Sequence, residues 1–148
     1  MSLLAAIRPD DWNIALFVHI LGAMLLVGAL ALVAASLASR DVRLGFRSLL
    51  YGVLPGWVVM RGAAEWIADK EGLNDVDPVP SWVDIGYSVA DPSLLLILIA
   101  TVCSGMAASR RRGEGRRGDG LRVTALVLTG ILLVASVVAI WAMSTKPT

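Results

Sequence analysis

The chain has 148 residues, of which 57% are hydrophobic and 17% charged, with a net charge of +1 and a mean hydropathy of +0.74. A soluble domain is typically about 25% charged and about 45–50% apolar, so a chain this short has too much apolar surface for a soluble core. The composition indicates one all-α domain in a membrane, where lipid covers the apolar side chains. The single cysteine, Cys103, excludes an intrachain disulfide and a multi-cysteine metal site.

Four stretches of the chain are long and apolar enough to be predicted as membrane-crossing helices. A crossing needs about 20 predominantly apolar residues. The predicted spans are, in chain order, residues 12–37, 44–68, 92–108 and 121–143. Asp10 and Asp11 precede the first span and suit a helix N-terminus, while Pro55 should kink the second. Pro92 suits the first turn of the third span.

Charged residues are sorted between the predicted connections. Arginines gather in and beside two short loops, 38–43 and 109–120, whereas acidic residues predominate in the long loop 69–91. The positive-inside rule places both Arg-rich loops in the cytoplasm and both termini outside it. Short loops join antiparallel neighbours, so the spans should form two hairpins in an up-down-up-down bundle. The aromatic residues expected at the outer boundary are Trp12, Trp66, Trp82, Tyr87 and Trp141.

Three polar side chains, His19, Arg61 and Glu65, are predicted inside the membrane. Such residues are costly in lipid and are therefore candidate functional residues. His19 lies seven residues after Trp12, which places it about 10 Å below the outer boundary, and Arg61 lies about 9 Å below it on the neighbouring antiparallel span. We therefore expect a polar cluster in the outer half of the membrane, with Asp91 as a further candidate member.

Each of these residues also has a purely structural interpretation. Arg61 and Glu65 are spaced as an i,i+4 ion pair that would neutralise itself near the interface. His19 could be a packed histidine that forms a hydrogen bond across two helices. Gly22, on the same face as His19, would admit either a packed helix or the edge of a flat cofactor.

His19 is the single histidine, which excludes a bis-histidine haem within one chain. Histidine–methionine ligation of haem b stays open, as does a site shared between two copies. Copper(I) prefers soft ligands and would suit the same residue types. Met60, beside Arg61, is the methionine at a matching depth. No cofactor follows from these residues alone, so haem and copper are alternatives rather than predictions.

Motifs of the common enzyme and nucleic-acid-binding classes are absent. The chain has no glycine-rich phosphate loop, no His-Glu-x-x-His motif and no nucleophile elbow. The Arg-rich stretch 110–122 is interpreted as stop-transfer charge with a flexible glycine-rich turn, to which contact with anionic lipid headgroups would be an extension. It has no interleaved aromatic residue for base stacking, so we do not expect it to bind nucleic acid. The protein is therefore interpreted as a non-enzymatic one.

The stretch His19-Ile20-Leu21-Gly22-Ala23, followed by Gly28, resembles the first helix of the copper-resistance CopD-like domain and of related small bacterial four-helix membrane families. The Leu54-Pro55-Gly56 turn is similar to that group as well. The resemblance covers about the first seventy residues. It implies the four-helix architecture and a bacterial inner membrane, with His19 as a candidate site. The further histidines of CopD-like members have no counterpart in this chain.

Three functions remain open from the sequence. The favoured one is an accessory, structural or self-associating membrane subunit, with the bilayer and a second copy or another membrane protein as partners. The second is a haem- or copper-binding module that uses His19 with Met60. The third is a transporter-like or proton-coupled element that uses His19, Arg61 and Glu65, because helices broken by residues such as Pro55 can line transport sites.

Overall fold

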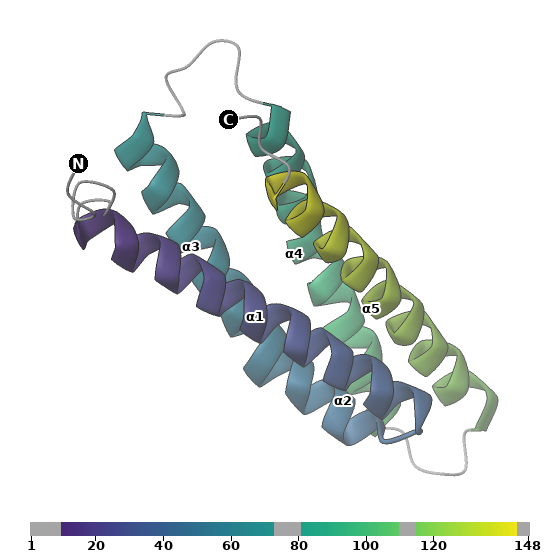
Figure 1. Ribbon diagram of the computed structural model, residues 1–148. Helices are drawn as coiled ribbons and strands as arrows, with labels where there is room; N and C mark the ends of the chain where they lie inside the picture. The colour runs from purple at the N-terminus through teal and green to yellow at the C-terminus, as the bar shows by residue number, and fades with distance from the viewer. Residues whose placement is uncertain (1–9, 73–80, 110–114, 145–148) are drawn as a thin grey trace, which may run out of the picture.

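The structure, a computed structural model, describes residues 10–72, 81–109 and 115–144, which are helical except for turns at residues 39–41 and 72. The elements are α1 (Asp10–Ala38), α2 (Val42–Ser48), the π-helical segment η2 (Leu49–Val53), α3 (Leu54–Glu71), α4 (Ser81–Ser109) and α5 (Gly115–Ser144) (Figure 1). The described part of the chain contains no strand, which confirms the all-α class.

The helices form two antiparallel pairs. One pair is α1 with the continuous line of α2, η2 and α3, and the other is α4 with α5 (Figure 1). The two pairs diverge toward the end where α1 begins and α5 ends. The buried core between them is made of aliphatic side chains, including Leu30 and Val33 of α1, Val53 of η2, Ile97 of α4 and Leu132 of α5. Antiparallel pairing of sequence neighbours agrees with the short connections predicted above.

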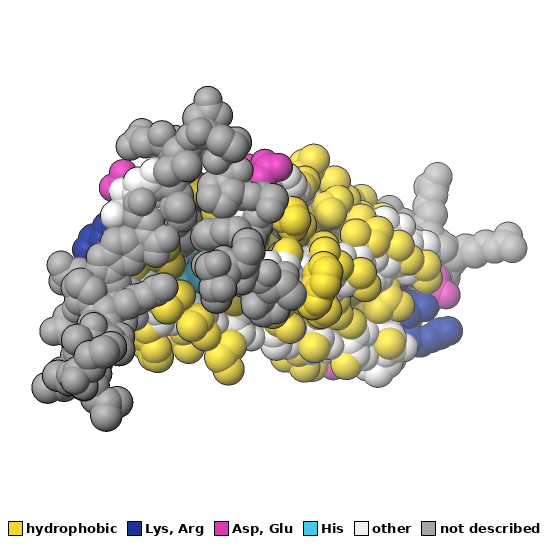
Figure 2. Space-filling view, turned by 45° about the horizontal axis from the view of Figure 1, so that its top comes forward, with side chains coloured by type: hydrophobic (Ala, Val, Ile, Leu, Met, Phe, Trp, Pro, Cys, Tyr) yellow, Lys and Arg dark blue, Asp and Glu magenta, His cyan; other side chains and the backbone are white. Residues whose placement is uncertain are grey.

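Three helices contain apolar segments long enough to cross a membrane. These segments are Ile14–Ala38, Val83–Ser109 and Gly118–Met143. Large apolar side chains, among them Phe17, Met24, Leu95 and Val134, are exposed on the outside of the molecule. Figure 2 shows such side chains over a broad face, with charged groups at its margins. A contiguous apolar surface of this kind needs lipid to cover it, so the protein is a membrane protein.

The second predicted span, 44–68, is helical throughout but is not among those three segments. Its regular helix is interrupted by η2, where the N–H of Leu54 donates to the carbonyl of Leu49 in an i→i+5 bond. Pro55 follows directly and has no N–H to donate, so the preceding turn widens. The irregularity predicted at Pro55 is therefore a π turn.

The third predicted span begins earlier than expected. α4 starts at Ser81 rather than at Pro92, which lies inside it, so much of the predicted loop 69–91 is helix. A proline inside a helix removes a backbone hydrogen bond. Side chains provide other bonds beside it, because the Ser93 hydroxyl donates to the Val89 carbonyl and the Trp57 indole donates to the Ala90 carbonyl. The position of Pro92 was thus a misleading signal for a helix start.

A tight turn joins α1 to α2. The N–H of Asp41 donates to the Ser36 carbonyl at 2.8 Å and the N–H of Arg40 donates to the Leu37 carbonyl at 3.3 Å, which is the Schellman pattern. Arg40 takes the left-handed conformation that this pattern requires, with φ of 66°. Asp41 then caps α2, where its Oδ1 accepts from the N–H of Leu44 at 3.1 Å. These bonds direct α2 back along α1.

Replacing Arg40 with glycine is expected to stabilise the protein by about 1 kcal/mol. A left-handed non-glycine residue costs about 1–2 kcal/mol, and the greater freedom of glycine in the unfolded chain offsets part of the gain. Reversible unfolding in mixed micelles would measure the change. Arg43→Gly removes the same charge from inside α2, and it should lower the stability because glycine is a poor helix former. Equal effects of both variants would contradict strain at Arg40.

Candidate functional site

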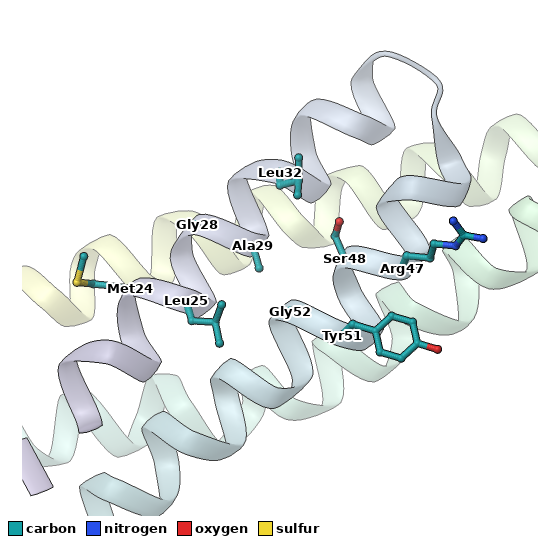
Figure 3. Close-up of a pocket in the computed structure, with 9 residues that line it drawn as sticks. All are labelled: Met24, Leu25, Gly28, Ala29, Leu32, Arg47, Ser48, Tyr51 and Gly52. Carbon is teal, nitrogen blue, oxygen red and sulfur yellow. The ribbon is translucent and has the colours of Figure 1, made fainter. Parts of the chain in front are cut away.

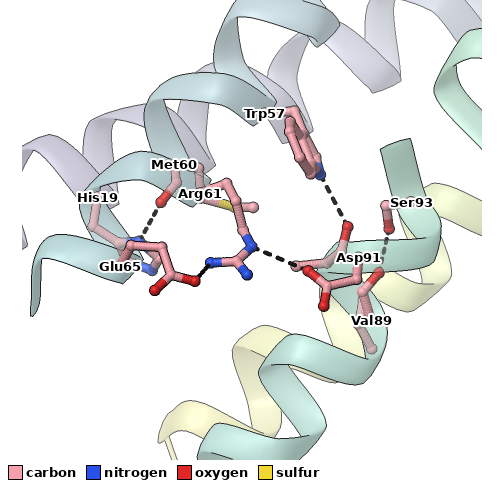
Figure 4. Close-up of polar contacts among 9 residues, drawn as sticks. His19, Trp57, Met60, Arg61, Glu65, Val89, Asp91 and Ser93 are labelled. Atoms are coloured by element: carbon pink, nitrogen blue, oxygen red, sulfur yellow. Dashed lines mark hydrogen bonds and ion pairs between the residues drawn. The ribbon is translucent and has the colours of Figure 1, made fainter. Parts of the chain in front are cut away.

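Arg61 is the centre of a polar cluster that joins α3 to α4. Its Nε donates to Asp91 Oδ1 at 3.1 Å, and its Nη1 donates to Glu65 one turn further along α3. The guanidinium also lies over the ring of Tyr87, 4.6 Å from its centroid, in the arrangement of a cation–π contact. The Arg61 side chain is 20% exposed. Figure 4 shows the two carboxylates beside the half-buried Arg61 cation, and the Tyr87 ring is the third group that contacts it.

Trp57 makes a second link between the same two helices. It lies one helical turn before Arg61 on α3, and its Nε1 donates to the Ala90 carbonyl at 3.1 Å. The Trp57 ring packs against the hydrophobic core on its other side. The acceptor belongs to the turn of α4 just before Pro92, and Asp91 follows it directly. Trp57 and Arg61 therefore hold adjacent residues of α4.

His19 reaches the cluster from α1 through the backbone. Its Nδ1 lies 3.0 Å from the Met60 carbonyl oxygen, in the residue that precedes Arg61. A carbonyl can only accept, so Nδ1 carries a hydrogen and donates it, which leaves Nε2 as the ring nitrogen whose lone pair could bind a ligand. The ring is half-buried. This bond across two helices agrees with the structural interpretation of His19, and it also fixes the direction of the ring.

Close packing of α1 on α3 makes this bond geometrically accessible. A Cβ added to Gly22 would lie 2.6 Å from the Met60 backbone nitrogen, and one added to Gly56 would lie 2.9 Å from the Leu26 nitrogen. Both distances are too short for real side chains, so the two glycines are what let the backbones meet. The edge of a flat cofactor cannot lie against Gly22, because the backbone of α3 occupies that place. That interpretation of Gly22 is wrong.

The structure brings most of the predicted site residues together. Arg61 and Glu65 form the expected i,i+4 pair, Asp91 joins them from α4, and His19 contacts the backbone beside them. Tyr87 was expected at the membrane boundary, and its role beside Arg61 was missed. Tyr87 lies four residues before Asp91, so the two residues share one face of a helix. This signal was missed because the predicted helix began at Pro92, whereas α4 begins at Ser81.

The geometry of the cluster is that of a helix-to-helix clamp. Among the described residues, every buried side-chain nitrogen and oxygen has a hydrogen-bond partner. Within the same part of the chain, no three His, Cys, Asp or Glu side chains gather as a metal-binding group. One cation, Arg61, pairs with two carboxylates, and these contacts join α3 to α4. Nε2 of His19, which makes no hydrogen bond within the cluster, is a candidate atom for ligating an added group.

Comparison of the chain with protein-family models, with curated proteins and with solved structures gives no match. The resemblance to CopD-like domains therefore depends on the sequence stretches 19–28 and 54–56 alone. No residue role comes to this chain from a relative, and its function has to be argued from its own geometry.

Proposed function

We propose that this protein is a small, non-enzymatic integral membrane protein that acts as a structural, accessory or self-associating subunit in a bacterial inner membrane. One observation carries the proposal. The intramembrane cation, Arg61, is held by Glu65 of its own helix and by Asp91 and Tyr87 of the next hairpin. Polar groups paired in this way stabilise the packing of helices, and every charged member of the cluster has a partner that accounts for its position.

We further propose that the line of α2, η2 and α3 is a fourth crossing. It lies along α1 from Leu37, which Gly45 contacts beside the turn at residues 39–41, to Gly22 and His19, which Met60 contacts in the opposite half. A helix that accompanies a membrane span over this length traverses the same depth. Pairing of Arg61 lowers the cost of placing this helix in lipid.

The charge distribution supports an orientation with both termini outside the cytoplasm. Arg122, about two turns into α5, donates from Nη1 to the Leu37 carbonyl at 2.7 Å, so the first part of α5 lies against the end of α1. Arg40 and Arg43 lie at that same end of the molecule. Cations gathered at one end of a membrane bundle indicate its cytoplasmic side.

A haem- or copper-binding module is the second candidate, and the His19 hydrogen bond favours it. Histidines that ligate metals almost always donate their other ring N–H to a carbonyl or carboxylate, as Nδ1 of His19 does to Met60. Nε2 would be the ligating atom. A second ligand would have to come from a methionine such as Met60 or from a second copy of the chain.

Substitution of His19 separates these two candidates. We expect protein purified in mild detergent, from cells supplied with haem precursor and copper, to lack a Soret band and stoichiometric copper. His19→Ala should keep the oligomeric mass and lose only about 1 kcal/mol of stability, the net value of one hydrogen bond. The haem- or copper-binding module would be established instead if the unmodified protein showed a Soret band or one copper per chain. His19→Ala would then have to remove that signal, and the control Met60→Leu would have to weaken it.

A further inference from the structure

An open groove of about 480 Å³ runs between α1 and the segment of α2 and η2. Its apolar wall comes from α1, and the opposite wall from the turns around the π segment (Figure 3). The residues that matter for its chemistry are Met24, Leu25, Gly28, Leu32, Arg47 and Tyr51. Ligand sites in proteins have volumes of about 300–1,000 Å³, so the groove is large enough for part of a small molecule.

Two features of the sequence create this groove. Gly28 has no side chain, and a Cβ placed there would meet no atom within 4 Å. Just beside it, Gly52 of η2 comes so close to α1 that an added Cβ would lie 2.8 Å from the Ala29 Cβ. The helices therefore touch along the floor of the groove and leave it open at Gly28. The wall from Met24 to Leu32 extends about 12 Å along α1.

One end of the groove carries a positive charge. Arg47 lines it and is exposed, as is Tyr51, whose side chain is 75% exposed. Within the described residues no carboxylate pairs with Arg47, and none lines the groove. Arg47 lies seven residues after Arg40 of the α1–α2 turn, which is about 10 Å along the helix. Its long side chain can extend to the headgroup level of that leaflet.

We propose that this groove binds one anionic phospholipid from the leaflet on the Arg-rich side. An acyl chain lies along the apolar wall beside Gly28, and the phosphate lies at Arg47, where the Tyr51 hydroxyl is a further donor. The charge complementarity selects lipid over a peptide or a second copy of the chain, because the groove pairs an uncompensated cation with an apolar trough that opens to the bilayer. The inference rests on the membrane insertion proposed above.

Lipid retention by matched variants tests this site. The protein is exchanged into micelles that contain equal phosphatidylglycerol and phosphatidylcholine, and bound lipid per chain is measured by native mass spectrometry. We expect the unmodified protein to retain phosphatidylglycerol preferentially. Arg47→Gln should reduce that preference about fivefold, which corresponds to about 1 kcal/mol for one basic residue at an anionic surface. The control Arg43→Gln removes an equal charge one turn away, outside the groove, and should reduce the preference less.

Filling the groove gives an independent measurement. Gly28→Leu places a side chain into open space and should abolish retention of both lipids, whereas Gly130→Leu, at an equally open position of α5, should not. Three results would overturn the lipid site. The unmodified protein could retain the two lipids equally, or Arg47→Gln and Arg43→Gln could have equal effects. The third such result is a change of oligomeric mass in Gly28→Leu. Carbonate extraction of membranes keeps the two proposals apart, because release of the chain would overturn membrane insertion itself.

Discussion

Replacing Gly22 with alanine is expected to destabilise the folded protein by about 2 kcal/mol, within the range of about 1–3 kcal/mol for overpacking a well-packed site. The added Cβ would lie 2.6 Å from the Met60 nitrogen and 2.9 Å from its Cα. Both are backbone atoms, so no flexible side chain can move aside, and α3 has to shift away from α1. Equilibrium unfolding in mixed micelles, followed by circular dichroism, would measure the loss.

Gly28→Ala is the matched control for this prediction. Gly28 lies on the same helix, but a Cβ there meets nothing within 4 Å. Alanine is the better helix former by about 0.5–1 kcal/mol, so this variant should be neutral or more stable than the unmodified protein. The two substitutions should therefore change the stability in opposite directions. A loss of equal size in both would show that general helix distortion, and not the close crossing of α1 on α3, sets the cost.

The same crossing shows what the sequence could and could not predict. Small residues at Gly22 and Gly56 indicate close helix packing wherever they occur. They do not say which backbone comes close, and here it is that of Met60 and Leu26 respectively. Apolar periodicity is weak guidance in a membrane helix, since lipid-facing and buried faces are equally hydrophobic. Partner faces therefore emerge only from the three-dimensional arrangement.

Charge sorting was a better guide than the local turn signals. It predicted that Arg61, Glu65 and Asp91 lie in one half of the molecule, and the structure joins them by ion pairs. Pro92 was misleading as a signal for the start of a helix. A proline in the first turn of a helix and a proline inside a helix cannot be told apart from the neighbouring residues. Near that proline, the Ser93 side chain forms a hydrogen bond within α4 and the Trp57 side chain forms one from α3. Neither bond could be predicted from the local sequence. Misplacing the helix start concealed the role of Tyr87.

Arg61→Gln is expected to cost about 2 kcal/mol. The value lies between about 0–1 kcal/mol for an exposed ion pair and about 3–5 kcal/mol for breaking a buried one, because Arg61 is largely buried whereas Glu65 and Asp91 are 48% and 62% exposed in the protein alone. The substitution leaves two carboxylates without their cation and removes the contact with Tyr87. Unfolding in the same micelles gives the measurement, and Arg43→Gln at the opposite end controls for loss of charge.

The two carboxylates should contribute unequally. Glu65→Gln removes a pair within α3, which is worth about 0.2–0.5 kcal/mol, whereas Asp91→Asn weakens the link between the two hairpins and should cost more. If Arg61 clamps α3 to α4, the double variant Arg61→Gln with Asp91→Asn should lose less stability than the sum of the single losses, with a coupling of about 1 kcal/mol. Strictly additive losses would mean that the Arg61–Asp91 pair does not hold the two hairpins together. In that case the structural function proposed for this cluster would have to be abandoned.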